Sequence, residues 1–209
     1  MKKQLDKLKI KIKYDKKLVT FMIVLVLIGI ITGTFFTLIL NGNDKKLVIE
    51  YIESFVESIS NNKLVFQDTL KNALISNMVY ILSVWILGIS IIGLPVIVLI
   101  TFWKSFVIGF SISSFIITYG IKGCILSFIY IFPHFIINLL FFIILSTYAI
   151  RLSLKLVSTI LNKKSLDFKL IINKYFNILL LCTIIIILSV LYEVFIMPIV
   201  IKFIVSLMF

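Results

Sequence analysis

Five apolar stretches, each about as long as the ~20-residue helix that crosses a ~30 Å hydrocarbon core, occupy most of this 209-residue chain. They lie at about 18–40, 72–92, 94–119, 123–150 and 176–198. Hydrophobic residues make up 61% of the chain and charged residues 14%, a balance that a water-facing surface does not tolerate. The sequence therefore predicts an all-α polytopic membrane protein, with residues 1–209 as a single integral-membrane domain and the lipid bilayer as its surroundings.

The first apolar stretch follows a basic head. Residues 1–17 carry eight lysines and two aspartates, and such a segment is expected to stay in the cytoplasm. The apolar core at 18–40 is longer than that of a cleaved secretory signal, and no A-x-A-like pair of small residues follows it. We expect an uncleaved anchor with a cytoplasmic N-terminus.

The two longer connecting segments differ in charge. The segment at 151–175 has six basic residues and one acidic residue, a net charge of +5, whereas the loop at 41–71 has four lysines and five acidic residues, a net charge of −1. With five crossings, the positive-inside rule places 151–175 inside, 41–71 outside and the C-terminus in the extracytoplasmic space. The net charge of +12 then reflects orientation and attraction to anionic lipids, and we expect no nucleic-acid partner.

The second and third stretches form one apolar block of more than 40 residues. A straight helix of that length would be about twice as long as the membrane is thick. Gly93 and Pro95 interrupt the block, which favours a tight helical hairpin.

The loop at 41–71 contains an amphipathic pattern. Val48, Ile52, Phe55 and Ile59 recur at the spacing of one helical face, and glutamates occupy the opposite face. The sequence predicts an outer-loop helix with two alternative roles. Either it lies on the protein's own spans, or its apolar face is a docking face for a partner protein.

Four polar residues stand out within the predicted spans, where polar side chains are costly and suggest function. Lys104 either extends its ammonium toward the cytoplasmic end of its helix or lines a water-filled cavity. Glu193, five residues before Pro198, lies either near the outer interface or inside the bundle, where Lys104 or His134 is the expected counter-group.

The other two are His134 and Asn138, one turn apart in the fourth stretch. Pro133 removes a backbone donor, and the His134–Asn138 pair is expected either to satisfy that break or to form a functional pocket. One histidine without nearby thiolates or carboxylates does not complete a metal site, so we expect no metal.

Small residues recur at Ser105, Gly109 and Ser113, one turn apart on the third stretch. Such a stripe favours close helix packing, with self-association into a homo-oligomer as the alternative. Cys124 and Cys182 both fall within spans and are expected to be packing residues, not a disulfide.

No nucleophile-and-base set, metalloprotease motif or phosphate-binding loop occurs in the sequence, so we expect no catalytic residues, no cofactor and no enzyme activity. An odd number of spans without internal repeats also disfavours a secondary transporter. A membrane scaffold, or a permease subunit of a larger complex, remains.

Several runs of residues resemble the stage II sporulation protein M family. They are WILGISIIGLP at 85–95, FWKSFVIGF at 102–110, LSFIYIFPH at 126–134, Arg151, and the ending YEVFIMP at 192–198. The wider family typically has a glutamate one turn after the histidine, where this chain has Asn138. The abundance of Ile, Lys, Asn and Phe suggests an AT-rich, clostridial spore former.

The resemblance implies a role in engulfment during spore formation. Family members resemble a scaffold that recruits two peptidoglycan hydrolases, the stage II sporulation proteins D and P, in the mother-cell membrane at the sporulation septum, where septal peptidoglycan is thinned. The alternative is a permease-like subunit of a transport complex with an ATP-binding partner on the basic segment at 151–175.

Overall fold

The computed structural model describes residues 16–61, 66–162 and 168–208. Within these ranges all regular secondary structure is helical, which confirms the all-α prediction. The helices are α2 (Lys16–Ile39), α3 (Gly42–Ser60), α4 (Phe66–Gly88), α5 (Gly93–Tyr119), α6 (Ile121–Tyr130), α7 (Phe132–Asn162), α8 (Phe168–Phe195) and α9 (Met197–Met208).

Five apolar segments are long enough to cross a membrane, as the sequence predicts. They coincide with α2, α4, α5 and α7, and with a fifth segment, Ile171–Ser206, that runs from α8 into α9. The predicted hairpin is also present, because α4 ends at Gly88 and α5 begins at Gly93. Both cysteines are free; Cys182 is buried, as expected of a packing residue, whereas Cys124 is exposed.

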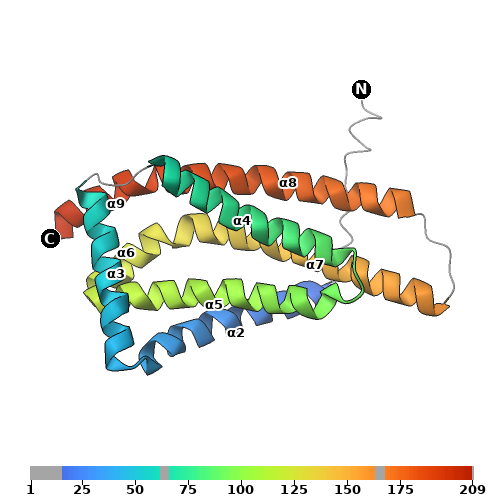
Figure 1. Ribbon diagram of the computed structural model, residues 1–209, viewed down its shortest axis with the longest axis horizontal. Helices are drawn as coiled ribbons and strands as arrows, with labels where there is room; N and C mark the ends of the chain where they lie inside the picture. The colour runs from blue at the N-terminus through green and yellow to red at the C-terminus, as the bar shows by residue number, and fades with distance from the viewer. Residues whose placement is uncertain (1–15, 62–65, 163–167, 209) are drawn as a thin grey trace.

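The long helices lie side by side, and α3 lies across one end of them (Figure 1). We call that end the α3 end, and the opposite end, where the α4–α5 turn lies, the turn end. The Ser153 hydroxyl on α7 donates a hydrogen bond to the carbonyl oxygen of Ser90 in that turn, at 3.0 Å. The last turns of α7 therefore lie at the turn end, whereas α9 lies beside α3 at the other (Figure 1).

The closest contact between long helices joins α2 to α5. Gly29 of α2 lies against Ser105 of α5, and Gly33, one turn later, lies against Phe106. Residue numbers rise together along the two helices, so they run parallel, and a side chain at Gly33 would meet the Phe106 carbonyl oxygen. Glycine at this position is what lets the backbones approach.

Two clusters of buried apolar side chains hold the helices together. The larger lies along the long helices and includes Met22, Ile81, Phe142 and Ile186, all completely buried. The smaller lies beneath α3, where Ile52 and Val56 pack with side chains of α5 and α6 and with Ile131. Because α3 buries its apolar face on this second cluster, the helix is part of the folded domain.

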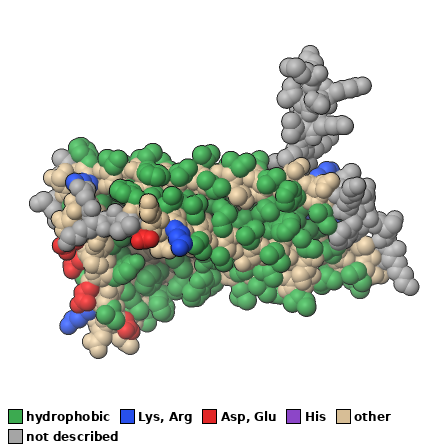
Figure 2. Space-filling model, turned by 45° about the horizontal axis from the view of Figure 1, so that its top comes forward, with side chains coloured by type: hydrophobic (Ala, Val, Ile, Leu, Met, Phe, Trp, Pro, Cys, Tyr) green, Lys and Arg blue, Asp and Glu red, His purple; other side chains and the backbone are tan. Residues whose placement is uncertain are grey.

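The outward faces of the long helices are apolar (Figure 2). Exposed large side chains include Phe35, Leu99, Trp103 and Leu188, all at least half exposed. Such a surface is compatible with lipid and not with water. Acidic side chains gather instead at the α3 end (Figure 2), where α3 exposes Asp44, Glu50, Glu53 and Glu57.

The fourth apolar stretch differs from the expected single span at 123–150. The chain turns at Gly120, with a φ of 59°, and forms the short helix α6 before α7 begins at Phe132. Pro133 cannot donate a backbone hydrogen bond, so it occupies the first turn of a new helix. The segment expected as a loop at 151–175 is also largely helical, since α7 continues to Asn162 and α8 starts at Phe168.

Candidate functional site

Lys104 lies deep inside the bundle and is only 6% exposed. Its Nζ donates a hydrogen bond to Asn77 Oδ1 on α4, at 3.2 Å. The same Nζ lies 4.5 Å from the ring centroid of Tyr80 and 4.9 Å from that of Phe142. Aromatic faces attract a cation, so the ammonium is held by one amide and two rings.

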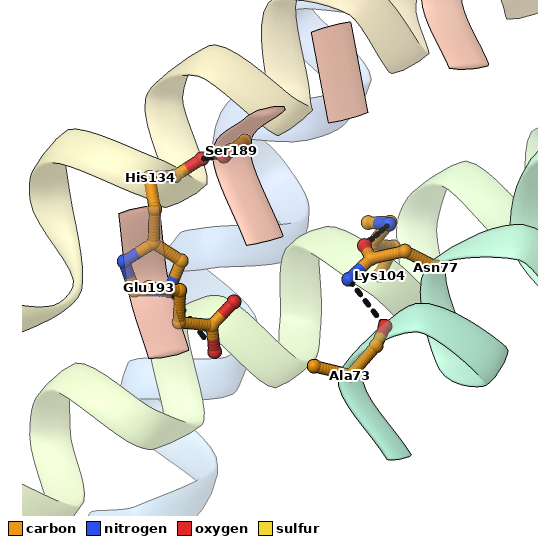
Figure 3. Close-up of polar contacts among 6 residues, drawn as sticks. All are labelled: Ala73, Asn77, Lys104, His134, Ser189 and Glu193. Carbon is orange, nitrogen blue, oxygen red and sulfur yellow. Dashed lines mark hydrogen bonds and ion pairs between the residues drawn. The ribbon is translucent and has the colours of Figure 1, made fainter. Parts of the chain in front are cut away.

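The Asn77 side chain is fixed on both sides, because its Nδ2 donates to the Ala73 carbonyl oxygen at 3.0 Å (Figure 3). Asn77 and Lys104 both lie about 16 Å along their helices from the α4–α5 turn. The ammonium of Lys104 therefore lies at about the same depth in the bundle as the backbone of Lys104, and it does not extend toward the turn end. This contact disfavours the interpretation that Lys104 extends its ammonium toward the cytoplasmic end of its helix.

His134 and Glu193 form a second polar contact, between the first turn of α7 and the last turn of α8. His134 Nε2 lies 3.7 Å from Glu193 Oε1, with His134 1% exposed and Glu193 22% exposed. The Ser189 hydroxyl, one turn before Glu193, donates to the His134 backbone carbonyl at 3.2 Å (Figure 3). Of the two counter-groups expected for an inward-facing Glu193, His134 is the one in contact.

The polar atoms at the α7 break are incompletely satisfied. Neither ring nitrogen of His134 has a hydrogen bond of good geometry, although the ring lies near the Tyr130 backbone one turn back. Asn138 is 3% exposed, and its Oδ1 also has no hydrogen-bond partner among the described residues. The His134 ring lies against the backbone of Tyr130, the last residue of α6, so His134 fits the expected role of satisfying the backbone at the break, whereas Asn138 Oδ1 has no partner there. The Ser189 hydroxyl contacts a different backbone group, the His134 carbonyl inside α7.

The two polar contacts belong to one cluster. Glu193 interacts electrostatically with Lys104 as well as lying beside His134. Figure 3 shows Glu193 between the His134 side of the bundle and the side where Lys104 and Asn77 lie. We call these four residues the polar cluster. It draws one residue each from α4, α5, α7 and α8, so it joins four of the five long helices.

A cavity of about 30 Å³ adjoins the polar cluster at the α3 end. Glu193 is the one acidic residue in its wall. The lining residues are Phe55, Ile59, Phe66, Thr69, Tyr130, Glu193, Val194 and Pro198. Since Phe55 and Ile59 belong to α3, the amphipathic helix covers the cavity.

The small-residue stripe on α5 is occupied by the chain itself. Ser105, Gly109 and Ser113 are all buried. A side chain at Gly109 would meet the backbone of Ile30 on α2, and the Thr34 hydroxyl of α2 donates to the Gly109 carbonyl at 3.3 Å. The stripe thus serves packing between α2 and α5, and the structure leaves it no open face for a second copy.

The proposed docking face of α3 is likewise turned toward the chain. Ile52 and Ile59 are buried, and the Phe55 ring packs 5.5 Å from that of Tyr130. Val48, which is half-buried, lines an apolar groove between α3 and α5. These side chains therefore favour the alternative in which α3 lies on its own spans. The surface that α3 offers to a partner is its acidic face.

Sequence reasoning missed the residues that hold Lys104. Asn77 is a polar residue within a predicted span, and that signal could have identified it. Tyr80 and Phe142 carry no such signal, because the chain has 8 tyrosines and 19 phenylalanines and only the packing of α4 and α7 against α5 selects these two.

Within the described part of the chain, no three His, Cys, Asp or Glu side chains come together as metal ligands. The polar cluster holds one ammonium, one imidazole, one carboxylate and one amide. It can hold charge and protons inside the membrane. It does not present a nucleophile beside a base.

Comparison with known families explains the motifs. The family model described as stage II sporulation protein M matches residues 22–198. The match begins in the second turn of α2 and ends at the start of α9. No curated protein and no solved structure matches the chain. The clostridial source suggested by composition stays a prediction. Because the match covers most of the 209 residues, the chain belongs to the stage II sporulation protein M family.

Proposed function

We propose that this sporulation-related membrane protein is a scaffold for engulfment, which holds the stage II sporulation proteins D and P at the septal membrane of the mother cell. The family match supports a role in sporulation, and the resemblance described above implies engulfment as the process and the two hydrolases as partners. A scaffold acts by raising the effective concentration of its partners at one place, which requires a fixed surface and no chemistry of its own.

The observation that carries this proposal is the position of α3. The helix is fixed across one end of the bundle by Ile52, Val56 and Ile59, which are 7%, 6% and 3% exposed. Its exposed face carries four carboxylates, Asp44, Glu50, Glu53 and Glu57. A rigid, charged shelf at the membrane surface is suited to holding a partner, because charge complementarity selects partners and speeds their association.

The scaffold needs α3 on the side of the cell wall. Exposed basic residues at the turn end include Lys16, Lys17 and Lys155, whereas at the α3 end the exposed carboxylates of α3 lie together with exposed lysines such as Lys46. By the positive-inside rule, the turn end faces the cytoplasm and both α3 and the C-terminus face outward. The proposed surface then meets the peptidoglycan that hydrolases act on.

Purification from sporulating cells tests the proposal. The full-length protein, tagged at its N-terminus, is extracted in mild detergent and the co-purifying chains are identified. We expect hydrolases D and P, and their recovery should fall when Glu50, Glu53 and Glu57 are all changed to Gln. Recovery of neither hydrolase at normal membrane levels of the protein would reject the scaffold role.

A permease-like subunit is the second candidate, and the polar cluster favours it. Lys104, Asn77, His134 and Glu193 place charge where the bilayer makes charge costly, a feature of ion and proton pathways. This candidate predicts that an ATP-binding protein co-purifies through the turn end. The same purification therefore distinguishes the two functions.

A further inference from the structure

We infer that two copies of this chain associate within the membrane through the outward face of α4. The contact runs along a row of exposed side chains that we call the α4 seam, formed by Asn72, Ile75, Val79, Leu82 and Ile86. The inference goes beyond the scaffold role and does not depend on it. It begins from a mismatch between how apolar each span is and how well the bundle covers it.

Among the five spans, α4 is both the least apolar and the least buried. In its most apolar 18 residues only 11% are buried, against 28%, 39%, 50% and 33% in α2, α5, α7 and the fifth span. Polar side chains are costly in hydrocarbon, so the least apolar span is expected to be the one that other helices cover most. The opposite arrangement indicates that α4 is covered by a helix from outside this chain.

The uncovered face of α4 carries polar side chains at bilayer depth. The helix packs against α5, α7 and α8 (Figure 1), and Asn72 and Ser76 are exposed on its opposite face. They lie about 24 Å and about 18 Å along the helix from Gly88, where α4 ends, and so within a ~30 Å hydrocarbon core measured from that end. An amide at this depth needs a hydrogen-bonding group, which lipid tails do not supply.

The α4 seam has the spacing of a coiled coil. Its members are separated by 3, 4, 3 and 4 positions, in the order Asn72, Ile75, Val79, Leu82 and Ile86. This heptad pattern is the one with which two helices pack side by side over several turns. The four apolar members are 51%, 56%, 46% and 61% exposed in the single chain, so the seam is open. Val79 and Ile86 fall at the a position and Leu82 at d, a distribution that favours two parallel helices.

A second copy of this chain fits the seam because the seam is complementary to itself. In a pair related by a two-fold axis along the bilayer normal, the two α4 helices run parallel and each seam residue meets its own equivalent. The Asn72 amide both donates and accepts, so the two amides can hydrogen-bond to each other. A single asparagine at an a position fixes the register and the number of helices in such a pair.

The charges at the α3 end of the seam are complementary as well. Asp68 lies four residues before Asn72 and continues the seam, and Lys71 flanks it; both are exposed. Helical side chains lean toward the helix N-terminus, which brings Lys71 of one copy toward the level of Asp68 of the other. The two acids and two bases of the pair then carry no net charge. This complementarity favours a second copy over an apolar helix of another protein.

Disulfide cross-linking between single cysteines tests the pairing. The full-length protein, with Cys124→Ala and Cys182→Ala, is purified, reconstituted into lipid vesicles and oxidised with copper phenanthroline. Leu82→Cys places a thiol on the seam. Leu99→Cys is the matched control, because Leu99 is 65% exposed on α5 and lies as far after Gly93 as Leu82 lies before Gly88. We expect at least about tenfold more covalent dimer from Leu82→Cys, since only closely facing residues satisfy disulfide geometry.

Variants of Asn72 separate specific pairing from crowding in the vesicle. In the Leu82→Cys background, Asn72→Leu should weaken association by about 3–30-fold, the range expected for one interhelical hydrogen bond. Asn72→Gln keeps an amide and should retain association. Equal cross-linking of Leu82→Cys and Leu99→Cys, or no dimer from Leu82→Cys, would overturn the inference. It would also be overturned if, in the membranes of sporulating cells, Leu82→Cys formed a cross-link only to a different protein, because the face would then belong to that protein's helix.

Discussion

The side chains of the polar cluster show how a charge is kept inside a membrane. Lys104 has one amide, two aromatic rings and the field of Glu193 around it. An isolated charge at this depth would be costly, and pairing reduces the cost without making the site a strong source of stability. What these residues contribute is a specific arrangement of four helices, since the partners of Lys104 on α5 come from α4, α7 and α8.

This pairing predicts the effect of removing the carboxylate. Glu193→Gln keeps the shape of the side chain and leaves Lys104 and His134 without an anion, so we expect the free energy of unfolding to fall by about 3 kcal/mol. Unfolding by dodecyl sulfate in mixed micelles, followed by circular dichroism, measures the change. Glu57→Gln, at an exposed position on α3, is the matched control and should change stability by less than about 0.5 kcal/mol.

The double variant with Lys104→Met tests whether the two charges act together. In the Lys104→Met background, Glu193→Gln should lower the free energy of unfolding by less than it does in the unaltered protein. The difference is the coupling energy between the two residues, expected to be about 0.5–3 kcal/mol. Additive effects of the two substitutions would mean that Lys104 does not depend on Glu193.

At the scale of single helices, the packing of α2 on α5 relies on missing side chains. Gly33 faces the Phe106 carbonyl oxygen, whereas nothing lies within 4 Å of the position that a side chain at Gly42 would take. Gly33→Ala should therefore force the two helices apart and lower the free energy of unfolding by about 1–3 kcal/mol. Gly42→Ala is the matched control. Equal stability of the two variants, measured by the same unfolding assay, would show that the α2–α5 contact yields easily.

The amphipathic helix α3 offers a second comparison between its two faces. Phe55→Glu places a carboxylate among Phe115 and Tyr130 and should detach α3, because burying an unpaired charge costs several kcal/mol. Glu53→Gln removes one exposed charge and should leave α3 in place. Limited proteolysis of α3 reads out detachment, and equal protection of both variants would contradict the packing described here.

These elements also show what the sequence could predict. The five spans, the α4–α5 hairpin and the amphipathic α3 depend on local length and periodicity, which the sequence displays directly. The missing donor of Pro133 predicts a local break, but the division of the stretch into α6 and α7 is not predicted, because the apolar run continues through it. The aromatic partners of Lys104 could not be predicted at all, because they depend on which helices become neighbours. The sequence predicts Glu193 either near the outer interface or inside the bundle beside Lys104 or His134, and only packing decides among these positions.

At the scale of the whole molecule, charge predicts which end is cytoplasmic. Ser54 on α3 and Ser90 in the α4–α5 turn are both exposed and lie at opposite ends of the bundle. In a background with Cys124→Ala and Cys182→Ala, we expect an impermeant thiol reagent to label Ser54→Cys in intact cells and to label Ser90→Cys only after lysis. The reverse pattern would invert the orientation and place the acidic face of α3 in the cytoplasm.

The scaffold role makes a prediction about whole cells that combines the family with the shape of the molecule. Deleting the gene should leave vegetative growth unchanged and stall or slow engulfment, because the hydrolases lose their position and keep their chemistry. Time-lapse membrane staining, with fluorescent fusions to hydrolases D and P, shows both effects in the same cells. Complementation of the deletion strain distinguishes loss of the acidic surface of α3 from loss of the folded protein. A gene with Glu57→Gln should restore engulfment fully. A gene in which Glu50, Glu53 and Glu57 are all changed to Gln should restore the protein to normal membrane levels but should not restore hydrolase localisation. Normal localisation of both hydrolases in the deletion strain would reject the scaffold, and normal localisation with the triple variant alone would reject α3 as its docking surface.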